Sequence, residues 1–357
     1  MTFDTATILP PLFRCLEALG LIARHLDPSE FAAAMDAVGT PDAALREVRA
    51  QMSEADLADE VNACLAASSD AALAGFDGLR AALDSGTMMA VFRTLRYLPR
   101  AQEALYPLAA MIPAVNKFFL DPSLRDDADA LSRAMQQQRD GETGVIHVNN
   151  ERGSRGGYSL YVPESYTPDQ AWPLVVALHG GSGNGCDFLW TWLRDARSFG
   201  AILVAPTSIG NSLGSTWALM GDDNDTPNFA RIVDDVRARY AIDPKRMMLT
   251  GMSDGGTFCY VTGLEARSPF THLAPVSATF HPMLIETADR ERLRGLPIHL
   301  VHGEKDWMFP VEVARQAERA FVAVGANVTY REIGDLAHTY PREINPAIMS
   351  WMNKSST

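Results

Sequence analysis

The sequence predicts two domains, an all-helical domain over residues 1–140 and an α/β domain over residues 141–357 with about eight mostly parallel strands. Up to about residue 138 the chain is rich in Ala, Leu, Met, Arg and Glu, and its apolar residues recur every three or four positions. From residue 144 onward, short β-rich runs alternate with helical segments, as in a sheet covered on both faces. The boundary is expected in the Asp-Gly-Glu-Thr-Gly segment at residues 140–144.

The helical half carries start and stop signals for six or seven helices. Asp27-Pro28 and Thr40-Pro41 each place a capping side chain before a proline, which suits the first position of a helix. Glycines stand where helices are expected to weaken or stop, at Gly20, Gly39, Gly75 and Gly86. The sequence leaves three alternatives open for this domain: a lid over the site, a dimerisation surface that forms a homo-oligomer, or a docking module.

The second half contains eight segments that read as strands. The first two are joined by a Gly-rich connection at residues 153–157, which predicts a hairpin. The third and fourth are fully apolar, as expected of central strands buried on both faces. The expected strands cover residues 145–148, 158–162, 172–178, 201–204, 247–250, 273–276, 298–301 and 328–333.

Composition argues against several classes of partner. With 47% apolar and 21% charged residues among 357, the composition predicts a folded protein with a sizeable core. Its net charge of −13 repels nucleic-acid phosphates and anionic lipids, so neither nucleic acid nor a membrane is expected as a partner. No stretch is expected to reach the roughly 20 apolar residues of a spanning helix, and the N-terminus does not resemble a signal peptide. A cytoplasmic location is therefore expected.

Metal ions are not expected either. The four cysteines lack the spacing of zinc ligands and fit buried thiols in a reducing compartment; they are Cys15, Cys64, Cys186 and Cys259. The acidic stretch at residues 221–225 lacks the spacing of a calcium loop, and it is expected to cap the helix over residues 230–240.

A serine lies in a G-x-S-x-G motif at residues 251–255, after a short apolar run and before a helix-compatible segment. Strand, tight turn and helix form the context of a nucleophile elbow, which would present Ser253 above the sheet. Glycine at both flanks of the turn avoids a collision between a Cβ and the neighbouring strand or helix. The motif also arises by chance, so the interpretation depends on finding an oxyanion loop, an acid and a histidine in matching places.

A Gly-rich segment, His-Gly-Gly-Ser-Gly-Asn-Gly at residues 179–185, follows the third expected strand. The backbone N–H groups of Gly181 and of Asp254, the residue after the serine, are predicted to form an oxyanion hole that stabilises a tetrahedral intermediate. The alternatives are a plain Gly-rich turn and a phosphate loop. No G-K-[ST] sequence follows, which disfavours the phosphate loop.

A serine hydroxyl needs a base, and the base needs a carboxylate that orients it. His338 is the predicted base, because of the eight histidines it alone follows the last expected strand, as the order Ser, Asp, His requires. The alternative is a surface histidine. Asp306, after the penultimate strand, is the predicted acid; Glu304 is expected to be more exposed, and Asp335 to shape its own loop.

Other side chains lie at strand ends. Trp217, His281 and Trp307 follow expected strands and are predicted to line a substrate pocket, with burial of a large aromatic under a loop as the alternative. His179 and His302 each precede a glycine at a strand end, and both are predicted to be structural histidines bonded to nearby backbone.

These segments together resemble a known family. The resemblance is carried by residues 158–163 (Tyr-Ser-Leu-Tyr-Val-Pro), 179–181, 251–256, 302–306 (His-Gly-Glu-Lys-Asp) and 337–338. Through them, the part from about Gly144 to the end resembles the α/β-hydrolase superfamily, and within it the polyhydroxybutyrate depolymerase-like, feruloyl and phospholipase/carboxylesterase-type esterases. The resemblance implies an α/β-hydrolase fold and hydrolysis of a carboxylic ester without metal or organic cofactor.

The leading hypothesis is a serine carboxylesterase acting on a small or medium ester, with Ser253, Asp306 and His338 as its catalytic triad. A thioesterase, an acyltransferase or a serine peptidase would use the same residues. A hypothesis of another class is a non-catalytic scaffold whose helical half binds a partner, and an intact triad argues against it.

Overall fold

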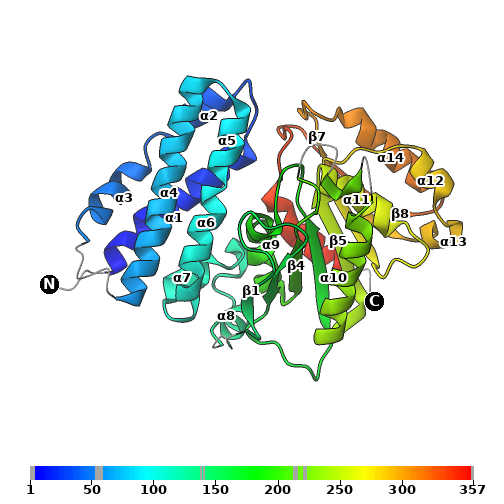
Figure 1. The fold of residues 1–357 in the computed structure, drawn as a ribbon, viewed down its shortest axis with the longest axis horizontal. Helices are drawn as coiled ribbons and strands as arrows, with labels where there is room; N and C mark the ends of the chain where they lie inside the picture. The colour runs from blue at the N-terminus through cyan, green and yellow to red at the C-terminus, as the bar shows by residue number, and fades with distance from the viewer. Residues whose placement is uncertain are drawn as a thin grey trace. The chain divides into compact units, whose positions relative to one another are not determined.

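A computed structural model describes residues 5–52, 59–136, 139, 141–211, 216–219 and 223–354. The chain divides into two compact units, Met1–Gln137 and Gln138–Thr357 (Figure 1). The first unit is helical and the second is built around one sheet, which confirms the expected fold class.

The first unit contains eight α-helices within its described residues, not the expected six or seven. A proline explains part of the difference, because Pro113 begins the short helix α7 in a stretch that the apolar pattern runs through, with short 3-10 helices at Tyr106–Ala110 and Pro122–Leu124 on either side. The helices are α1 (Thr5–Arg24), α2 (Phe31–Val38), α3 (Asp42–Arg49), α4 (Glu60–Ser85), α5 (Met88–Leu95), α6 (Tyr97–Leu105), α7 (Pro113–Phe118) and α8 (Ala128–Ala134).

The capping signals were partly right. Gly39 and Gly86 follow the ends of α2 and α4 with positive φ angles of 69° and 65°, as expected of helix stops. Gly75 lies inside α4, where a Cβ would come within 3.3 Å of the Leu19 side chain, so this glycine lets α1 and α4 approach closely. Gly20 likewise lies inside α1, and the Asp27 carboxylate accepts the N–H of Ser29 in a turn before α2 begins.

Helix α1 corrects one expectation. Among the described residues, Thr5–Arg24 is long and apolar enough to cross a membrane by length and composition alone. Many of its apolar side chains instead pack into the helical unit, since Ile8, Leu12 and Ile22 are fully buried. Core helices pass the same test, so the observation is weak evidence for a membrane span.

The second unit is an eight-stranded sheet in the order β1-β2-β4-β3-β5-β6-β7-β8. The first two pairings, β1 with β2 and β2 with β4, are antiparallel, and the other five are parallel. Each expected strand is present: β1 (Gly144–Val148), β2 (Tyr158–Val162), β3 (Trp172–Leu178), β4 (Ile202–Pro206), β5 (Ile242–Met252), β6 (His272–Val276), β7 (Pro297–Gly303) and β8 (Asn327–Ile333).

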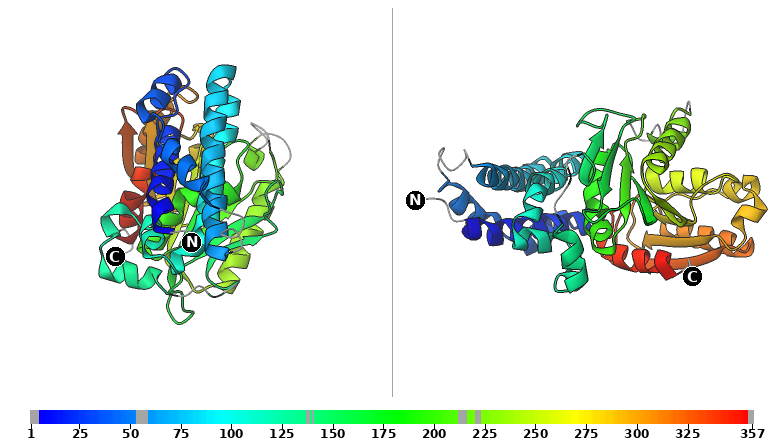
Figure 2. Two further views of the ribbon diagram at one scale, coloured as in Figure 1. Left: turned by 90° about the vertical axis from the view of Figure 1, so that its left-hand side faces the viewer. Right: turned by 90° about the horizontal axis from the view of Figure 1, so that it is seen from below.

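Helices cover both faces of this sheet. On one face α10 (Asp225–Arg239), α11 (Asp254–Gly263) and α14 (Val311–Ala323) share a core cluster with alternate strand residues such as Leu174 and Val176. Helices α9 (Gly185–Phe199) and α15 (Asn345–Lys354) pack together, and Figure 2 shows the red C-terminal helix on the side of the sheet opposite the yellow-green helices. Short helices α12 (Met283–Thr287) and α13 (Arg290–Leu293) connect β6 to β7.

Candidate active site

The candidate nucleophile, Ser253, lies on the sharp turn between β5 and α11. Its backbone has φ 56° and ψ −121°, a conformation that non-glycine residues rarely adopt and that costs on the order of 1–3 kcal/mol. The N–H of Ser253 donates to the carbonyl oxygen of Val276 at 3.0 Å, which ties the turn to the end of β6. The turn therefore has the geometry of the expected elbow.

Glycines at both flanks of the turn are a steric requirement. A Cβ on Gly255 would lie 2.5 Å from the carbonyl oxygens of Leu178 and His179, at the end of β3. A Cβ on Gly251 would lie 2.6 Å from the backbone of Gly255. Because backbone atoms cannot move aside as a flexible side chain can, both positions exclude any larger residue.

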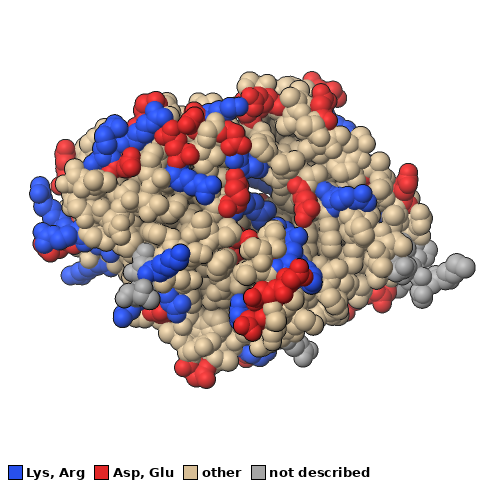
Figure 3. Space-filling model, turned by 180° about the vertical axis from the view of Figure 1, so that it is seen from behind, with Lys and Arg blue, Asp and Glu red and all other residues tan. Residues whose placement is uncertain are grey.

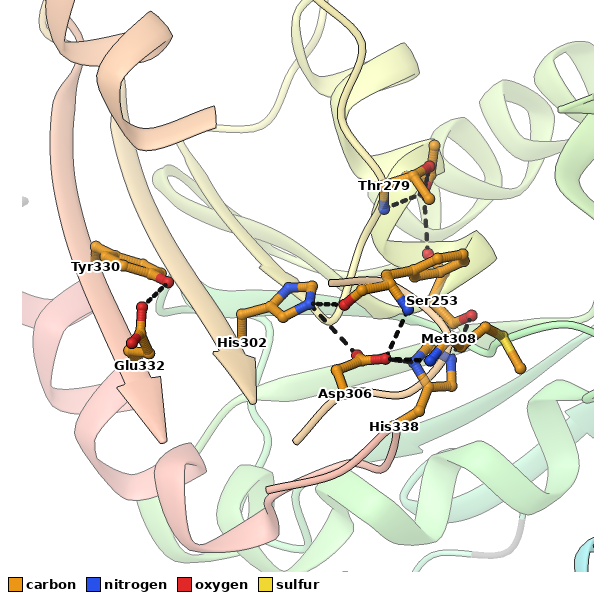
Figure 4. A network of polar contacts seen from close by, with 10 residues as sticks. Ser253, Thr279, His302, Asp306, Met308, Tyr330, Glu332 and His338 are labelled. Carbon is orange, nitrogen blue, oxygen red and sulfur yellow. Dashed lines mark hydrogen bonds and ion pairs between the residues drawn. The ribbon is translucent and has the colours of Figure 1, made fainter. Parts of the chain in front are cut away.

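His338 bridges Ser253 and Asp306, although the three residues follow three different strands. Its Nε2 lies 3.0 Å from Ser253 Oγ, and its Nδ1 lies 2.9 Å and 3.0 Å from the two carboxylate oxygens of Asp306 (Figure 4). A carboxylate only accepts hydrogen bonds, so Nδ1 carries the proton and Nε2 is left to accept the proton of the serine hydroxyl. All three side chains are largely buried.

The Asp306 carboxylate is held on several sides. Its Oδ1 accepts the backbone N–H groups of Met308 and Phe309 at 3.0 Å and 2.8 Å. Burial opposes ionisation, but the hydrogen bond from His338 and the neighbouring donors outweigh it, so the pKa of Asp306 lies below its ordinary value. The other candidate acids, Glu304 and Asp335, are exposed, and in this structure it is Asp306 that contacts His338.

The Gly-rich loop after β3 lies beside the nucleophile. A Cβ on Gly180 would be 3.3 Å from the Cβ of Ser253, so the backbone at Gly180 passes directly over the elbow. Asp254 is the first residue of α11, where backbone N–H groups point out of the helix end. These positions are compatible with the predicted oxyanion donors at Gly181 and Asp254, whose role remains a prediction.

Sequence reasoning missed the residue that holds this loop. The guanidinium of Arg155 donates to the carbonyl oxygen of Gly183 at 2.7 Å and to Ser208 Oγ at 2.5 Å, and thereby joins the loops after β3 and β4. Within the first loop, the N–H of Gly183 closes a turn onto the carbonyl oxygen of Gly180. Arginine in the β1–β2 connection offered no sequence signal, because its partners are backbone and hydroxyl groups of distant segments.

The two strand-end histidines bind backbone groups, as expected of structural histidines. His179 Nε2 accepts the N–H of Ser208 at 3.1 Å, and His302 Nε2 donates to the carbonyl oxygen of Phe309 at 2.8 Å. His302 has a second contact that the sequence did not reveal, because the same Nε2 lies 3.4 Å from Oδ2 of Asp306.

The three expected pocket residues have different surroundings. Trp217 is only 2% exposed, stacks on Phe258 and donates its indole N–H to the carbonyl oxygen of His179, so its surroundings favour the alternative of a buried aromatic. Trp307 is 46% exposed, and its ring centroid lies 6.1 Å from that of His338. His281 is exposed, and its Nδ1 accepts the N–H of Met283.

Within the described residues, no group of three or more His, Cys, Asp or Glu side chains is placed to hold a metal ion. Of the acidic stretch at residues 221–225, the first two residues lie outside the described part, while Asp223 accepts the N–H of Thr226 at the start of α10. Asp225 accepts the N–H of Ile209 and so ties α10 to the loop after β4.

On the face shown in Figure 3, basic side chains are interspersed with acidic ones.

Comparison with known proteins finds similarity to esterases. A family model described as phospholipase/carboxylesterase matches residues 221–356. A bifunctional acetylxylan esterase/xylanase of Neocallimastix patriciarum is 30% identical over 166 residues, which cover 45% of this chain and 23% of that protein. A probable feruloyl esterase C of Aspergillus clavatus is 27% identical over 141 residues, covering 38% of this chain and 48% of that protein.

The chain thus spans less than half of the length of these curated relatives. Among solved structures, a ferulic acid esterase superposes with a TM-score of 0.50 at 16% identity, covering 60% of this chain and 97% of that one, which supports the fold. The C-terminal part therefore has the α/β-hydrolase fold and is similar to carboxylic esterases, and the resemblance predicted from the sequence is confirmed.

Proposed function

We propose that this protein is a serine carboxylesterase that hydrolyses a small or medium carboxylic ester through an acyl-enzyme intermediate. The observation that supports this most is the unbroken chain of hydrogen bonds from Ser253 through His338 to Asp306. A serine on a strained turn, a histidine in the tautomer that accepts its proton, and a buried ionised carboxylate are what acyl transfer requires.

In the acylation step, His338 Nε2 takes the hydroxyl proton as Ser253 Oγ attacks the ester carbonyl. A new C–O bond forms, and the carbonyl π electrons move onto the oxygen, giving a tetrahedral intermediate. The N–H groups of Gly181 and Asp254 would donate to this oxyanion, and each such donor is worth about 3 kcal/mol of barrier. Asp306 stabilises the imidazolium that forms and keeps its proton on Nδ1.

Collapse of the intermediate breaks the bond to the alcohol, which leaves with the proton that His338 returns. Water then attacks the acyl-serine while His338 takes its proton, the acyl C–O bond breaks as that proton returns to Ser253 Oγ, and the carboxylic acid is released. Hydrolysis consumes one water and needs no oxidant or reductant, and His338 is the protein group through which each transferred proton passes.

A thioesterase, an acyltransferase and a serine peptidase are second candidates, because the same three residues would acylate from a thioester or an amide. The ester reading is preferred because the similar proteins are esterases. The non-catalytic scaffold is disfavoured, since a scaffold has no need for three aligned hydrogen-bonding side chains around a strained serine.

The remaining parts of the proposal are the cytoplasmic location, a small-molecule ester as the partner, no nucleic acid or membrane, and no cofactor. The helical unit is proposed to act as a lid, as a homo-oligomer surface or as a docking module. Activity of the full chain and of residues 140–357 on one ester panel tests the lid, and sedimentation of the full chain tests the oligomer.

Purified protein should hydrolyse p-nitrophenyl acyl esters, and Ser253→Ala should abolish both this activity and labelling by a fluorophosphonate. Competing thioester, amide and acyl-acceptor substrates assign the preferred acyl donor. A matched control is Ser268→Ala, which changes a serine outside the site. The proposal is overturned if a folded wild-type protein neither turns over any of these substrates nor reacts with the fluorophosphonate.

A further inference from the structure

The acid of the proposed triad touches two histidines. Figure 4 shows His338 and His302 on two sides of the Asp306 carboxylate, one reaching it from the loop after β8 and the other from strand β7. The proposed mechanism uses only His338. His302 is 1% exposed, so it is shielded from bulk water.

Hydrogen bonding fixes the state of His302. Its Nε2 lies 2.8 Å from the carbonyl oxygen of Phe309, and a carbonyl oxygen can only accept, so Nε2 carries a proton. Burial lowers the pKa of this imidazole, which therefore stays neutral at physiological pH. The same Nε2 lies 3.4 Å from Asp306 Oδ2, so a protonated ring nitrogen lies beside that carboxylate oxygen.

His302 therefore contacts two residues of the loop between β7 and α14. Asp306 and Phe309 lie three positions apart in this loop, and the backbone N–H of Phe309 donates to Asp306 Oδ1 at 2.8 Å. His302 sits on β7, whose pairing with β8 fixes its backbone opposite Glu332. One ring nitrogen of His302 thus connects both Asp306 and Phe309 to strand β7.

Phe309 carries this anchor to the catalytic base. Its ring packs edge-on against the His338 ring with centroids 5.0 Å apart, so a shift of Phe309 would change the packing around His338. The acid loop and the histidine loop are also joined directly, because the N–H of Lys305 donates to the carbonyl oxygen of Leu336 at 3.0 Å.

We propose that His302 is a positioning residue. Its Nε2–H holds Asp306 and Phe309 at the distances from His338 that the structure shows. It acts through the acid and does not exchange a proton with the substrate. This inference rests on the proposed function, because the placement of Asp306 beside His338 matters most when His338 must take a proton from Ser253.

Substitutions at position 302 separate the donor from the bulk of the ring. His302→Gln keeps an N–H donor near the place of Nε2, whereas His302→Leu removes it, and His302→Asn carries an amide too short to reach Phe309. His302→Leu and His302→Asn should lower kcat on a p-nitrophenyl ester about tenfold or more with KM within about twofold, since misplaced catalytic groups slow the chemical step. His302→Gln should retain kcat within about threefold.

A second readout does not depend on turnover. The Nδ1–H proton of His338, bonded to a carboxylate, gives a downfield proton NMR signal, which should persist in His302→Gln and broaden or move in His302→Leu.

The inference is overturned if His302→Leu keeps the wild-type kcat and signal, or if Gln, Asn and Leu lower kcat equally. If the wild type has no activity or fluorophosphonate labelling, the proposed function fails, while the NMR comparison still decides the role of His302. Should the Leu variant not fold, the Asn variant replaces it.

Discussion

His338 Nε2 lies 3.0 Å from Ser253 Oγ, although 85 positions separate the two residues in the sequence. Ser253 follows β5 and His338 follows β8, and β6 and β7 lie between these strands in the sheet. The loop after β8 must therefore run back along the carboxyl edge of the sheet to reach the serine. The acid after β7 meets the histidine on this path.

The choice of acid is tested by two amide substitutions. Asp306→Asn should lower kcat roughly 10³–10⁴-fold, because an amide at this place favours the wrong tautomer of the histidine. Asp335→Asn, on an exposed side chain in the histidine loop, should leave kcat within about threefold. The reverse result in steady-state kinetics would assign the acid to Asp335.

Glycine substitutions test the elbow packing. Gly255→Ala should destabilise the fold by several kcal/mol or prevent folding, because its Cβ would lie 2.5 Å from two backbone oxygens of the β3 end. Gly20→Ala is the matched control, since Gly20 lies within α1 and has nothing within 4 Å of a built Cβ. That change should be neutral or stabilise by up to about 1 kcal/mol in urea unfolding. Equal effects of the two variants would contradict the packing argument.

Trp307 is predicted to contact the ester. Its exposed ring lies beside His338, where the alcohol leaves, so Trp307→Ala should raise KM for bulky aryl esters more than for a small acetate. We expect a ratio of about five- to tenfold between the two effects, corresponding to roughly 1 kcal/mol of lost ring contact. A uniform change of KM across the ester panel would remove Trp307 from the substrate site.

Folding stability should fall as the pH drops from about 6.5 to about 4. Burial lowers the pKa of His272 and His299 to about 4, whereas both take up protons near pH 6.5 in the unfolded chain. The unfolded state then binds more protons, so stability that is present above pH 6.5 is lost at about 1.4 kcal/mol per pH unit for each histidine.

Urea unfolding at pH 7, 6 and 5 measures this slope. Both rings pack edge-on against Trp351, so His272→Phe and His299→Phe keep an aromatic ring at each place while removing the titrating group. Each variant should reduce the slope by about 1 kcal/mol per pH unit. An unchanged slope in the double variant would show that other groups cause the loss.

The buried pair of Arg197 and Glu164 provides a stability test away from the site. The Nε of Arg197 lies 3.0 Å from Glu164 Oε1, and the two side chains are 1% and 2% exposed. Arg197→Met should cost about 3–5 kcal/mol, because it leaves a buried carboxylate without its cation, and adding Glu164→Gln should recover part of that loss. Arg294→Met, at an exposed pair, should cost less than about 1 kcal/mol.

Sequence patterns identified all eight strands, because each contains a short apolar run or an alternation of apolar and polar residues. They predicted the helical unit less well. Continuous apolar periodicity did not show where prolines divide α6 from the short segments that follow it, or that Gly75 packs inside a helix. Helix division depends on which turns find a packing partner, and the pattern alone does not encode that choice.

The order of Ser253, Asp306 and His338 along the chain predicted which side chains the structure would bring together, because parallel strands carry their following loops to one edge. Chain order did not predict the residues that hold the loops of the site in place. Arg155 binds the backbone of Gly183, and His302 contacts both Asp306 and Phe309; these contacts join segments that the sequence pattern does not relate to one another.

By itself, the sequence determined the two-unit organisation, the strands, the elbow glycines and the identity of the candidate triad, since these follow from local periodicity, turn sterics and chain order. Tertiary structure alone decided that Trp217 is buried while Trp307 is exposed, that Arg155 binds the loop after β3, and that a second histidine contacts the acid. The reason is physical: a local pattern fixes backbone conformation, but distances of a few ångströms between loops are set by how whole strands and helices pack.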